Sequence, residues 1–337
     1  MKRFDQVVVV TLNPTIDRVL EVSDFRAGGH QRCVRRDRYP AGKGINVVRA
    51  MASLGQTATL TGFVGEAESE WYQQFLLGEG IEDCRLISVP GFTRENITVV
   101  DPNAPGSDTH LMEQGFTVMA DELAQLRDSL GPLASAGNLV SFCGSLPPGV
   151  SAEQFAELIR LCLDSGAEVA VDTSGDSLRA SARLPLWLVK PNRQELTELS
   201  GHTSQTDELL LSSASLLAEQ IRWVLLSLGG EGAVLVDSRI ARRAVLPLRT
   251  EEVVSTVGCG DILFGGFLAG WQGAEWKEGD LQEVPDPASE ALRRGVAAAT
   301  FAATQLTPTI ALARVQALEP DVEISNTDLP DASRPNE

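Results

Sequence analysis

The sequence predicts an α/β fold in which helices cover both faces of a mostly parallel central sheet. Strand-like and helix-like segments alternate along most of the 337 residues, and such alternation is typical of parallel sheets. Predicted strands such as 7–11 and 223–227 are also nearly continuous apolar runs, as strands buried on both faces are. The length suits one large domain with a small appendage.

Two periodicities define the predicted elements. Short β-branched and apolar runs predict strands, and apolar residues repeating every three or four positions predict helices. The segment 45–54 shows the helical repeat at Ile45, Val48, Met51 and Ala52. The predicted strands are 7–11, 57–64, 138–143, 168–172, 187–190, 223–227 and 233–237. The predicted helices are 45–54, 152–165, 193–200, 261–271 and 289–304.

Three segments depart from this alternation. Residues 13–39 and 93–114 are strand-like, more polar and contain turn residues, which predicts a separate small sheet, or lid, over one end of the main sheet. Residues 320–337 are rich in Asp, Pro, Ser and Asn, so we expect a disordered acidic tail. A single domain is therefore predicted over residues 1–319.

Composition excludes several classes of protein. A formal net charge of −18 opposes nucleic-acid binding, which needs clustered Lys and Arg, but allows a small anionic ligand. No apolar run is long enough for a transmembrane helix or a signal peptide, so no membrane association is expected. The five cysteines are odd in number and lack CxxC spacing, which favours reduced thiols and a cytoplasmic location. The three histidines are scattered, and a His-based metal site is not expected.

The segment STVGCGD at 255–261 is the most informative for chemistry. Gly258 and Gly260 allow a tight turn with outward N–H groups, and the predicted helix that follows adds its positive end. Together they would form an anion hole for a phosphoryl group, with Asp261 at its rim. An ordinary turn with Asp261 as the helix N-cap is an equally good interpretation.

Two better-known phosphate loops are absent from the sequence. Gly42, Lys43 and Gly44 lack the upstream glycine and the hydroxyl residue of a Walker A loop. A dinucleotide fingerprint beginning at Gly258 would need glycine at the position of Leu263. The second failure makes an NAD-dependent oxidoreductase an unfavoured alternative.

Polar residues at predicted strand and helix ends offer further candidates. Lys43 and Asn46 stand at a helix start, and Asp17 follows the first strand, where α/β sheets bind ligands. Asn192 and Glu195 are three residues apart at another helix start, where their oxygens could support a hydrated Mg²⁺. For Lys43 and Asn46 a plain helix entry is the favoured alternative, and for Asp17 an Asx turn is the commoner outcome. For Asn192 and Glu195 the alternative is a capping box.

The order of the motifs is more specific than any one of them. NPTID, AGKGINVVR, TREN, GSLPPGV, VKPNRQEL, SLGGEGA and STVGCGD, read in sequence, resemble the ordered motifs of the ribokinase-like (PfkB-type) carbohydrate kinases over residues 7 to 305. LNPTID, AGKGINVVR and WLVKPNRQEL look most like the 1-phosphofructokinase branch. Tagatose-6-phosphate kinases and the minor 6-phosphofructokinases share much of this pattern. The resemblance implies a three-layer α/β/α fold with a β-sheet lid.

The resemblance also implies a role for individual residues. Asp261 would be the general base. Backbone N–H groups of an anion hole would come from Gly258, Cys259 and Gly260. The sugar phosphate would be bound by Asp17, Gly42, Lys43, Asn46, Arg94 and Asn96. ATP would be bound by Lys190, Asn192, Ser227, Gly229 and Gly232. Mg²⁺ would be organised through water by Asn192 and Glu195.

The implied reaction is phosphoryl transfer from ATP to fructose 1-phosphate, which gives fructose 1,6-bisphosphate. Tagatose 6-phosphate and fructose 6-phosphate remain alternative substrates. The family usually has Ala at Cys259 and a small polar residue at Ile262, so a catalytically weak sensor of sugar phosphate or nucleotide is the alternative of another class. Relatives commonly dimerise through the lid, which implies a homodimer, and a monovalent-cation requirement stays open.

Overall fold

A ten-stranded sheet forms the centre of the chain in the computed structural model. The structure describes residues 3–104, 108–201, 206–218, 220–274, 286–305, 307 and 309–329. In spatial order the strands are β14 (Glu323–Asp328), β13 (Ile240–Val245), β12 (Ala233–Val236), β11 (Trp223–Ser227), β10 (Leu188–Val189), β9 (Glu168–Asp172), β8 (Leu139–Cys143), β1 (Val7–Thr11), β4 (Thr59–Gly65) and β5 (Cys84–Val89).

The strands from β5 to β11 all run parallel, whereas β12, β13 and β14 are antiparallel additions at one end. Because parallel strands end at the same edge, the residues at the carboxyl ends of β9, β10 and β11 are brought side by side. These residues include Asp172, Lys190 and Ser227, so the topology alone gathers them at one edge.

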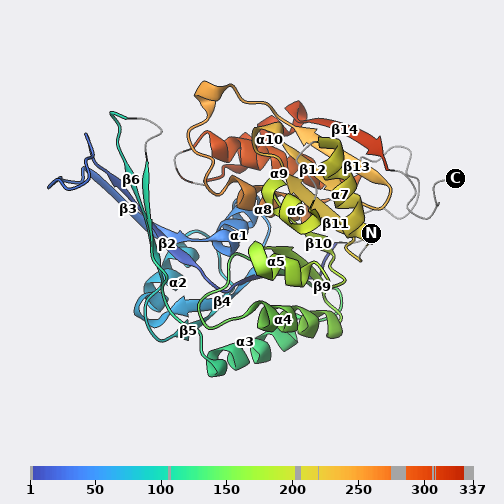
Figure 1. Cartoon of the computed structure of the whole chain (residues 1–337), viewed down its shortest axis with the longest axis horizontal. Helices are drawn as coiled ribbons and strands as arrows, with labels where there is room; N and C mark the ends of the chain where they lie inside the picture. Colours follow the sequence, from blue (N-terminus) through green and yellow to red (C-terminus); the bar gives the residue numbers. More distant parts are fainter. Residues whose placement is uncertain are drawn as a thin grey trace.

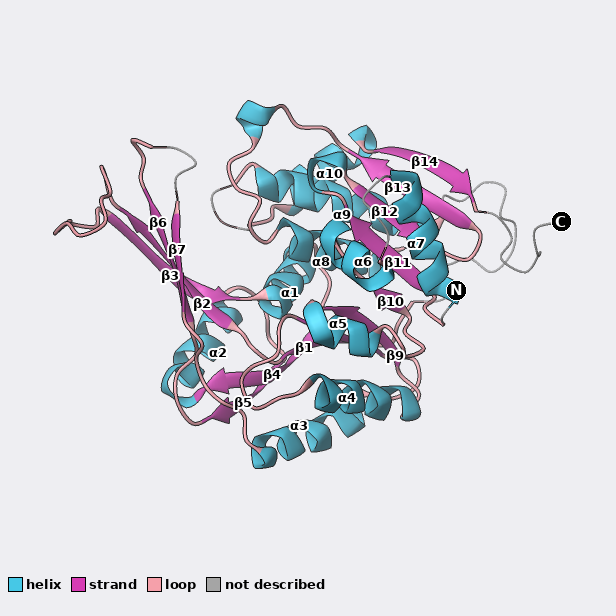
Figure 2. Ribbon diagram, viewed as in Figure 1, coloured by secondary structure: helices cyan, strands magenta, loops and turns pink. Residues whose placement is uncertain are grey.

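Helices cover both faces of this sheet (Figure 2). Side chains of β1 alternate between two buried clusters, with Val7 and Val9 in one and Val8 and Val10 in the other. The first cluster is completed by α1 (Lys43–Ser53), α2 (Ser69–Gly78), α8 (Cys259–Gly273), α9 (Pro287–Ala303) and α10 (Leu312–Leu318). The second is completed by α3 (Ala120–Leu133), α4 (Ala152–Asp164), α5 (Gly175–Ser181), α6 (Arg193–Ser200) and α7 (Thr206–Ala218).

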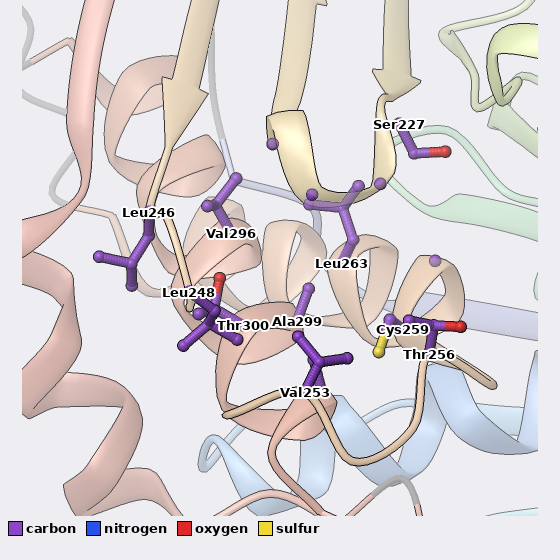
Figure 3. Close-up of a pocket in the computed structure, with 15 residues that line it drawn as sticks. Ser227, Leu246, Leu248, Val253, Thr256, Cys259, Leu263, Val296, Ala299 and Thr300 are labelled. Atoms are coloured by element: carbon purple, nitrogen blue, oxygen red, sulfur yellow. The ribbon is translucent and has the colours of Figure 1, made fainter. Parts of the chain in front are cut away.

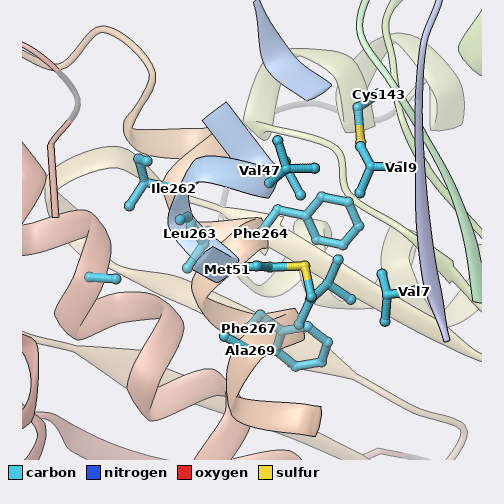
Figure 4. Packing of buried hydrophobic residues seen from close by; sticks show 14 of the residues in the cluster. Val7, Val9, Val47, Met51, Cys143, Ile262, Leu263, Phe264, Phe267 and Ala269 are labelled. Carbon is cyan, nitrogen blue, oxygen red and sulfur yellow. The ribbon is translucent and has the colours of Figure 1, made fainter. Parts of the chain in front are cut away.

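Close packing of α1 against α8 brings two distant parts of the sequence together. A Cβ atom added at Gly265 of α8 would lie 2.6 Å from the Cβ of Ala50 in α1, so only glycine allows this approach. Val47 and Met51 of α1 lie beside Phe264 of α8 in the same buried cluster (Figure 4). The helix starts, which carry polar residues, therefore lie next to each other.

A separate four-stranded sheet projects from the main body (Figure 1). Its strands, in order, are β3 (Arg35–Ala41), β2 (Thr15–Glu21), β6 (Glu95–Val100) and β7 (Thr109–Met112). The phenol of Tyr72, fully buried in α2, donates to the carbonyl oxygens of Thr15 and Ala41, each 3.1 Å away. This group ties the inner ends of β2 and β3 to the helical layer beneath.

The predicted fold class and the separate small sheet are confirmed. The prediction of disorder after residue 319 is wrong for residues 320–329, because Glu323–Asp328 forms β14 and pairs with β13. A strand at the edge of a sheet is held mainly by backbone hydrogen bonds to its neighbour, so it does not need apolar side chains. The polar composition of residues 320–329 therefore did not indicate the strand. Residues 330–337 lie outside the described residues. No helix of the described segments is long and apolar enough to cross a membrane.

Candidate active site

The first turn of α8 presents free backbone N–H groups. Gly258 is the N-cap residue, with a φ of 76° that glycine adopts readily. In the described part of the chain, the N–H groups of Gly258 and Gly260 have no hydrogen-bond partner, whereas that of Cys259 lies 3.3 Å from the Thr256 carbonyl oxygen. The alternative in which Asp261 caps the helix is wrong, because Asp261 lies inside the first turn and makes no capping bond.

Asp261 is a buried carboxyl group whose neighbours act on its pKa in opposite directions. Asn46 Nδ2 of α1 donates to its Oδ2 atom over 2.9 Å. Burial, followed by the negative charge of Asp172, raises the pKa of the Asp261 carboxyl above its ordinary value. Lys43, the hydrogen bond from Asn46 and Lys190 oppose this rise. A carboxylate of raised pKa is a better proton acceptor, which suits a general base.

Asp172 links the two lysines of the site. Its Oδ1 atom lies 2.7 Å from Lys43 Nζ and its Oδ2 atom 3.4 Å from Lys190 Nζ. The Asp172 side chain is fully buried, and that of Lys190 is 3% exposed. Sequence analysis missed Asp172, although it ends the correctly predicted strand 168–172. The rule that singled out Asp17, a carboxylate just beyond a strand, would have found it too.

The predicted sugar-binding residues of the small sheet lie beside one another. Asp17 Oδ1 accepts hydrogen bonds from Thr15 Oγ1 at 3.0 Å and from Asn96 Nδ2 at 3.2 Å. Burial raises the pKa of Asp17, and these two hydrogen bonds act in the opposite direction. Arg94 Nη2 donates to the Asn13 carbonyl at 3.2 Å. Within the described residues, Arg94 Nε and Asn96 Oδ1 are buried without a partner.

Gly42 joins this group to α1. Its φ is 108°, and an added Cβ would lie 3.3 Å from the Cα of Pro14 and from the amide nitrogen of Thr15. The backbone before Lys43 therefore passes directly over the start of β2, which brings the small sheet and the N-terminus of α1 into contact. Gly42 thus lies against the start of the strand that carries Asp17, and Asn46, in the first turn of α1, contacts Asp261.

A cavity of about 250 Å³ adjoins the first turn of α8 (Figure 3). Ser227, Gly229 and Gly232 line one side, and Cys259 and Gly260 line another, so predicted residues from two motifs meet here. The rest of the wall is mainly apolar and comes from Gly230, Leu246, Leu248, Val253, Thr256, Leu263, Val296, Ala299, Thr300 and Ala303. Sequence analysis missed the contribution of α9, because its apolar residues read as ordinary core positions.

Lys190 lies just beyond this cavity. An added Cβ at Gly260 would be 3.6 Å from Lys190 Nζ, so the ammonium group stands close to the first turn of α8. A cation therefore stands next to the turn that carries the unpaired N–H groups.

Asn192 and Glu195 form a capping box at the start of α6. Asn192 Oδ1 accepts from the Glu195 N–H at 2.9 Å, and Glu195 Oε2 accepts from the Asn192 N–H at 2.8 Å. The backbone of Asn192 also pairs with that of Ser227, beside the cavity. Among the described residues, no group of three or more His, Cys, Asp or Glu side chains could hold a metal. The side-chain oxygens of Asn192 and Glu195 are few, and a small number of protein oxygens suits hydrated Mg²⁺, which keeps most of its water.

The two departures from the family pattern leave Asp261 in place. Ile262 is fully buried and belongs to the first hydrophobic cluster. Burial, with a contribution from Asp261, raises the pKa of the Cys259 thiol to about 11, so this side chain stays neutral near pH 7. Its Sγ atom lies 3.7 Å from the Ser255 carbonyl oxygen.

Comparison with known proteins adds independent evidence. The pfkB family carbohydrate kinase model matches residues 5–313. The 1-phosphofructokinase of Haemophilus influenzae is 33% identical over 268 residues, which cover 79% of this chain and 84% of that protein. The 1-phosphofructokinase of Bacillus subtilis is 31% identical over 265 residues, or 78% of this chain and 85% of its own length.

Solved structures agree with these matches. Phosphofructokinase-2 from Escherichia coli, in complex with substrates and products, has a TM-score of 0.83 and 29% identity, covering 94% of this chain and 98% of its own. Ribokinase from Thermotoga maritima has a TM-score of 0.68 at 20% identity, covering 93% and 98% of the two chains. The second likeness shows a shared fold.

Proposed function

Because the chain belongs to the pfkB family of carbohydrate kinases and is an ATP-dependent sugar kinase, we propose that it phosphorylates fructose 1-phosphate to fructose 1,6-bisphosphate. Relatives named 1-phosphofructokinase at 31% and 33% identity support this substrate. The observation that carries the chemistry is a buried Asp261, of raised pKa, beside a helix N-terminus with unpaired N–H groups.

In the proposed reaction, Asp261 accepts the proton of the sugar 6-hydroxyl as its oxygen attacks the γ-phosphorus of ATP. The new P–O bond forms in line with the bond to the leaving ADP oxygen, which breaks. Asn46 donates to one oxygen of Asp261 and leaves the other for the hydroxyl. The N–H groups of Gly258 and Gly260 would stabilise the charge on the transferring group, with Cys259 as a third donor.

Positive charges at the site would hold the phosphates in position. Lys190 would contact the ATP phosphates, and its pairing with Asp172 fixes its direction. The apolar cavity beside Ser227 suits the adenine base and sugar of ATP. Mg²⁺, when bound, would neutralise phosphate charge, with Asn192 and Glu195 holding it through water.

The sugar phosphate would lie between the small sheet and α1. Asp17 and Asn96, with Gly42, Lys43 and Asn46, would bind its hydroxyls. Arg94 would bind its phosphate, because its Nε–H is a buried donor without a partner among the described residues. The small sheet would then act as a lid that excludes water from the reacting groups.

A turnover assay with three sugar phosphates tests the substrate. We expect kcat/KM for fructose 1-phosphate to exceed that for tagatose 6-phosphate and fructose 6-phosphate by about tenfold or more, since misplaced phosphate contacts cost transition-state binding. ADP release is the readout. A preference for either other sugar would contradict the substrate. Binding of sugar phosphate in calorimetry with no ADP release would support the sensor instead.

We also propose a homodimer formed through the small sheet. The edge strand β7 carries Leu111 and Met112, which are 55% and 75% exposed, and an uncovered apolar edge favours pairing with a second copy. Light scattering at micromolar concentration is expected to give twice the chain mass of 36.1 kDa. A monomer under these conditions would contradict the dimer. All five cysteines are free thiols, which supports the proposal of a cytoplasmic enzyme.

A further inference from the structure

Asn46 uses the two ends of its amide group differently. Its Nδ2 atom donates to Asp261, and its Oδ1 atom lies 3.3 Å from Nη1 of Arg49, one turn later in α1. A guanidinium group has only donors, so the amide atom that faces it must be the oxygen. Arg49 therefore dictates which end of Asn46 faces the carboxylate.

Arg49 is itself held firmly. Its Nε and Nη2 atoms lie 3.0 and 2.8 Å from the two oxygens of Glu79, and Nη2 also donates to the Pro40 carbonyl at 3.0 Å. The side chain is only 9% exposed. Such a forked pair fixes both the place and the plane of the guanidinium. A chain of contacts thus runs from Glu79 through Arg49 and Asn46 to Asp261.

We propose that Arg49, oriented by Glu79, is a positioning residue that locks Asn46 in the orientation that donates a hydrogen bond to Asp261. This inference rests on the proposed role of Asp261 as base. Without Arg49 the amide of Asn46 can turn over, which would place its oxygen against the carboxylate. The carboxylate form would then lose a donor and face a repelling oxygen.

Several other groups face these residues and are not replaced in Arg49→Met, although the charge of Arg49 also lowers the pKa of Asp17, Tyr39 and Tyr72. Around Asp261 they are Lys43, Asp172, Lys190, Cys143 and Cys259. Around Arg49 they are Glu79, Asp17, Tyr39 and Tyr72. Because the hydrogen bond from Asn46 lowers the pKa of Asp261, its loss raises that pKa further. The acidic limb of the activity profile should then move to higher pH.

Replacing Arg49 with methionine, which fills similar space without donors, tests the proposal. We expect kcat/KM of Arg49→Met to fall by about 10- to 100-fold on the acidic side, the equivalent of one hydrogen bond to a charged group. The loss should shrink as pH rises and the base ionises. In an Asn46→Ala background, Arg49→Met should cost much less, because the residue through which it acts on Asp261 is gone; what remains is its charge effect on Asp17.

Arg242 provides a matched control. It is also buried, 8% exposed, and pairs with Asp237 and Asp286 at 2.7 and 2.6 Å, but it contacts none of the site residues. Arg242→Met should lower the unfolding temperature and leave the shape of the pH profile unchanged. Glu79→Gln should shift the acidic limb of the pH profile in the same direction as Arg49→Met. The shift should be smaller, because this variant weakens the paired hydrogen bonds that hold Arg49 but keeps Arg49 itself.

Two outcomes would overturn the inference. One is an equal loss at every pH in Arg49→Met, and the other is full additivity with Asn46→Ala. If Arg49→Met does not fold, an unshifted profile in Glu79→Gln overturns it instead. Asp261→Asn separates the two proposals. Full turnover in that variant would contradict the role of Asp261 as base. If Asp261→Asn is inactive but the effects of Arg49→Met and Asn46→Ala add up fully, only the role of Arg49 is contradicted.

Discussion

Asp261→Asn is expected to reduce kcat by about 10²–10⁴-fold, the usual effect of losing a general base. Asparagine has nearly the same shape and still accepts the hydrogen bond from Asn46, but its amide cannot take the proton of the sugar hydroxyl. The KM for the sugar phosphate should change little, because the hydroxyl still finds a polar partner. Steady-state assay of ADP release with fructose 1-phosphate measures both constants.

The fold of this variant should survive, since a neutral side chain is easier to bury than a carboxylate. The unfolding temperature of Asp261→Asn should therefore equal or exceed that of the wild type. Nucleotide binding, measured by calorimetry, serves as the control for an intact cavity. Turnover within a few-fold of the wild type would exclude Asp261 as the base.

Asp172→Ala is expected to lower the free energy of unfolding by about 3–5 kcal/mol, the cost of leaving a buried charge without its partner. Lys190 is almost completely buried, and it forms an ion pair with Asp172. Lys43, whose ammonium also pairs with Asp172, is more exposed and would suffer less. Equilibrium unfolding in urea, compared with the wild type, measures the loss. An unchanged midpoint would show that neither lysine depends on this carboxylate.

Asp172→Asn is the matched variant that keeps the shape of the side chain. The negative charge of Asp172 raises the pKa of Asp261, so its removal lowers that pKa. Asp261 then stays ionised to lower pH, and the acidic limb of kcat/KM should move to lower pH. This direction is opposite to that expected for Arg49→Met, so the two variants check each other.

Periodicity predicted seven of the ten strands of the main sheet, because short apolar runs are typical of strands buried on both faces, but β5, β13 and β14 were not predicted. The strand 223–227 and the helix 193–200 match β11 and α6 to the residue. Predicted helix starts were less accurate: α8 begins at Cys259, two residues before the prediction, because Gly258 adopts a left-handed conformation that allows an early start. The polar strand β14 was missed because its partner, β13, is more than 70 residues earlier in the chain.

The candidate site was predictable where residues follow a strand or open a helix. Asp17, Lys43, Asn46 and Asp261 are all in such places, and the structure gathers the last three within one polar cluster. Arg49 could not be singled out, because its role depends on Glu79, which is 30 residues away in sequence and adjacent only after α1 and α2 have packed. Long-range pairing of this kind leaves no local pattern.

The phenol of Tyr72 anchors the small sheet at one end, because it hydrogen-bonds to the inner ends of both β2 and β3. Any displacement of β2 and β3 should then increase with distance from Thr15 and Ala41, the two anchored positions. Asp17 is two residues from Thr15 and is paired with Asn96, so both residues lie at the end of the sheet where the least displacement is expected. Anchoring at this end would thus preorganise the proposed sugar contacts of Asp17 and Asn96 before substrate arrives.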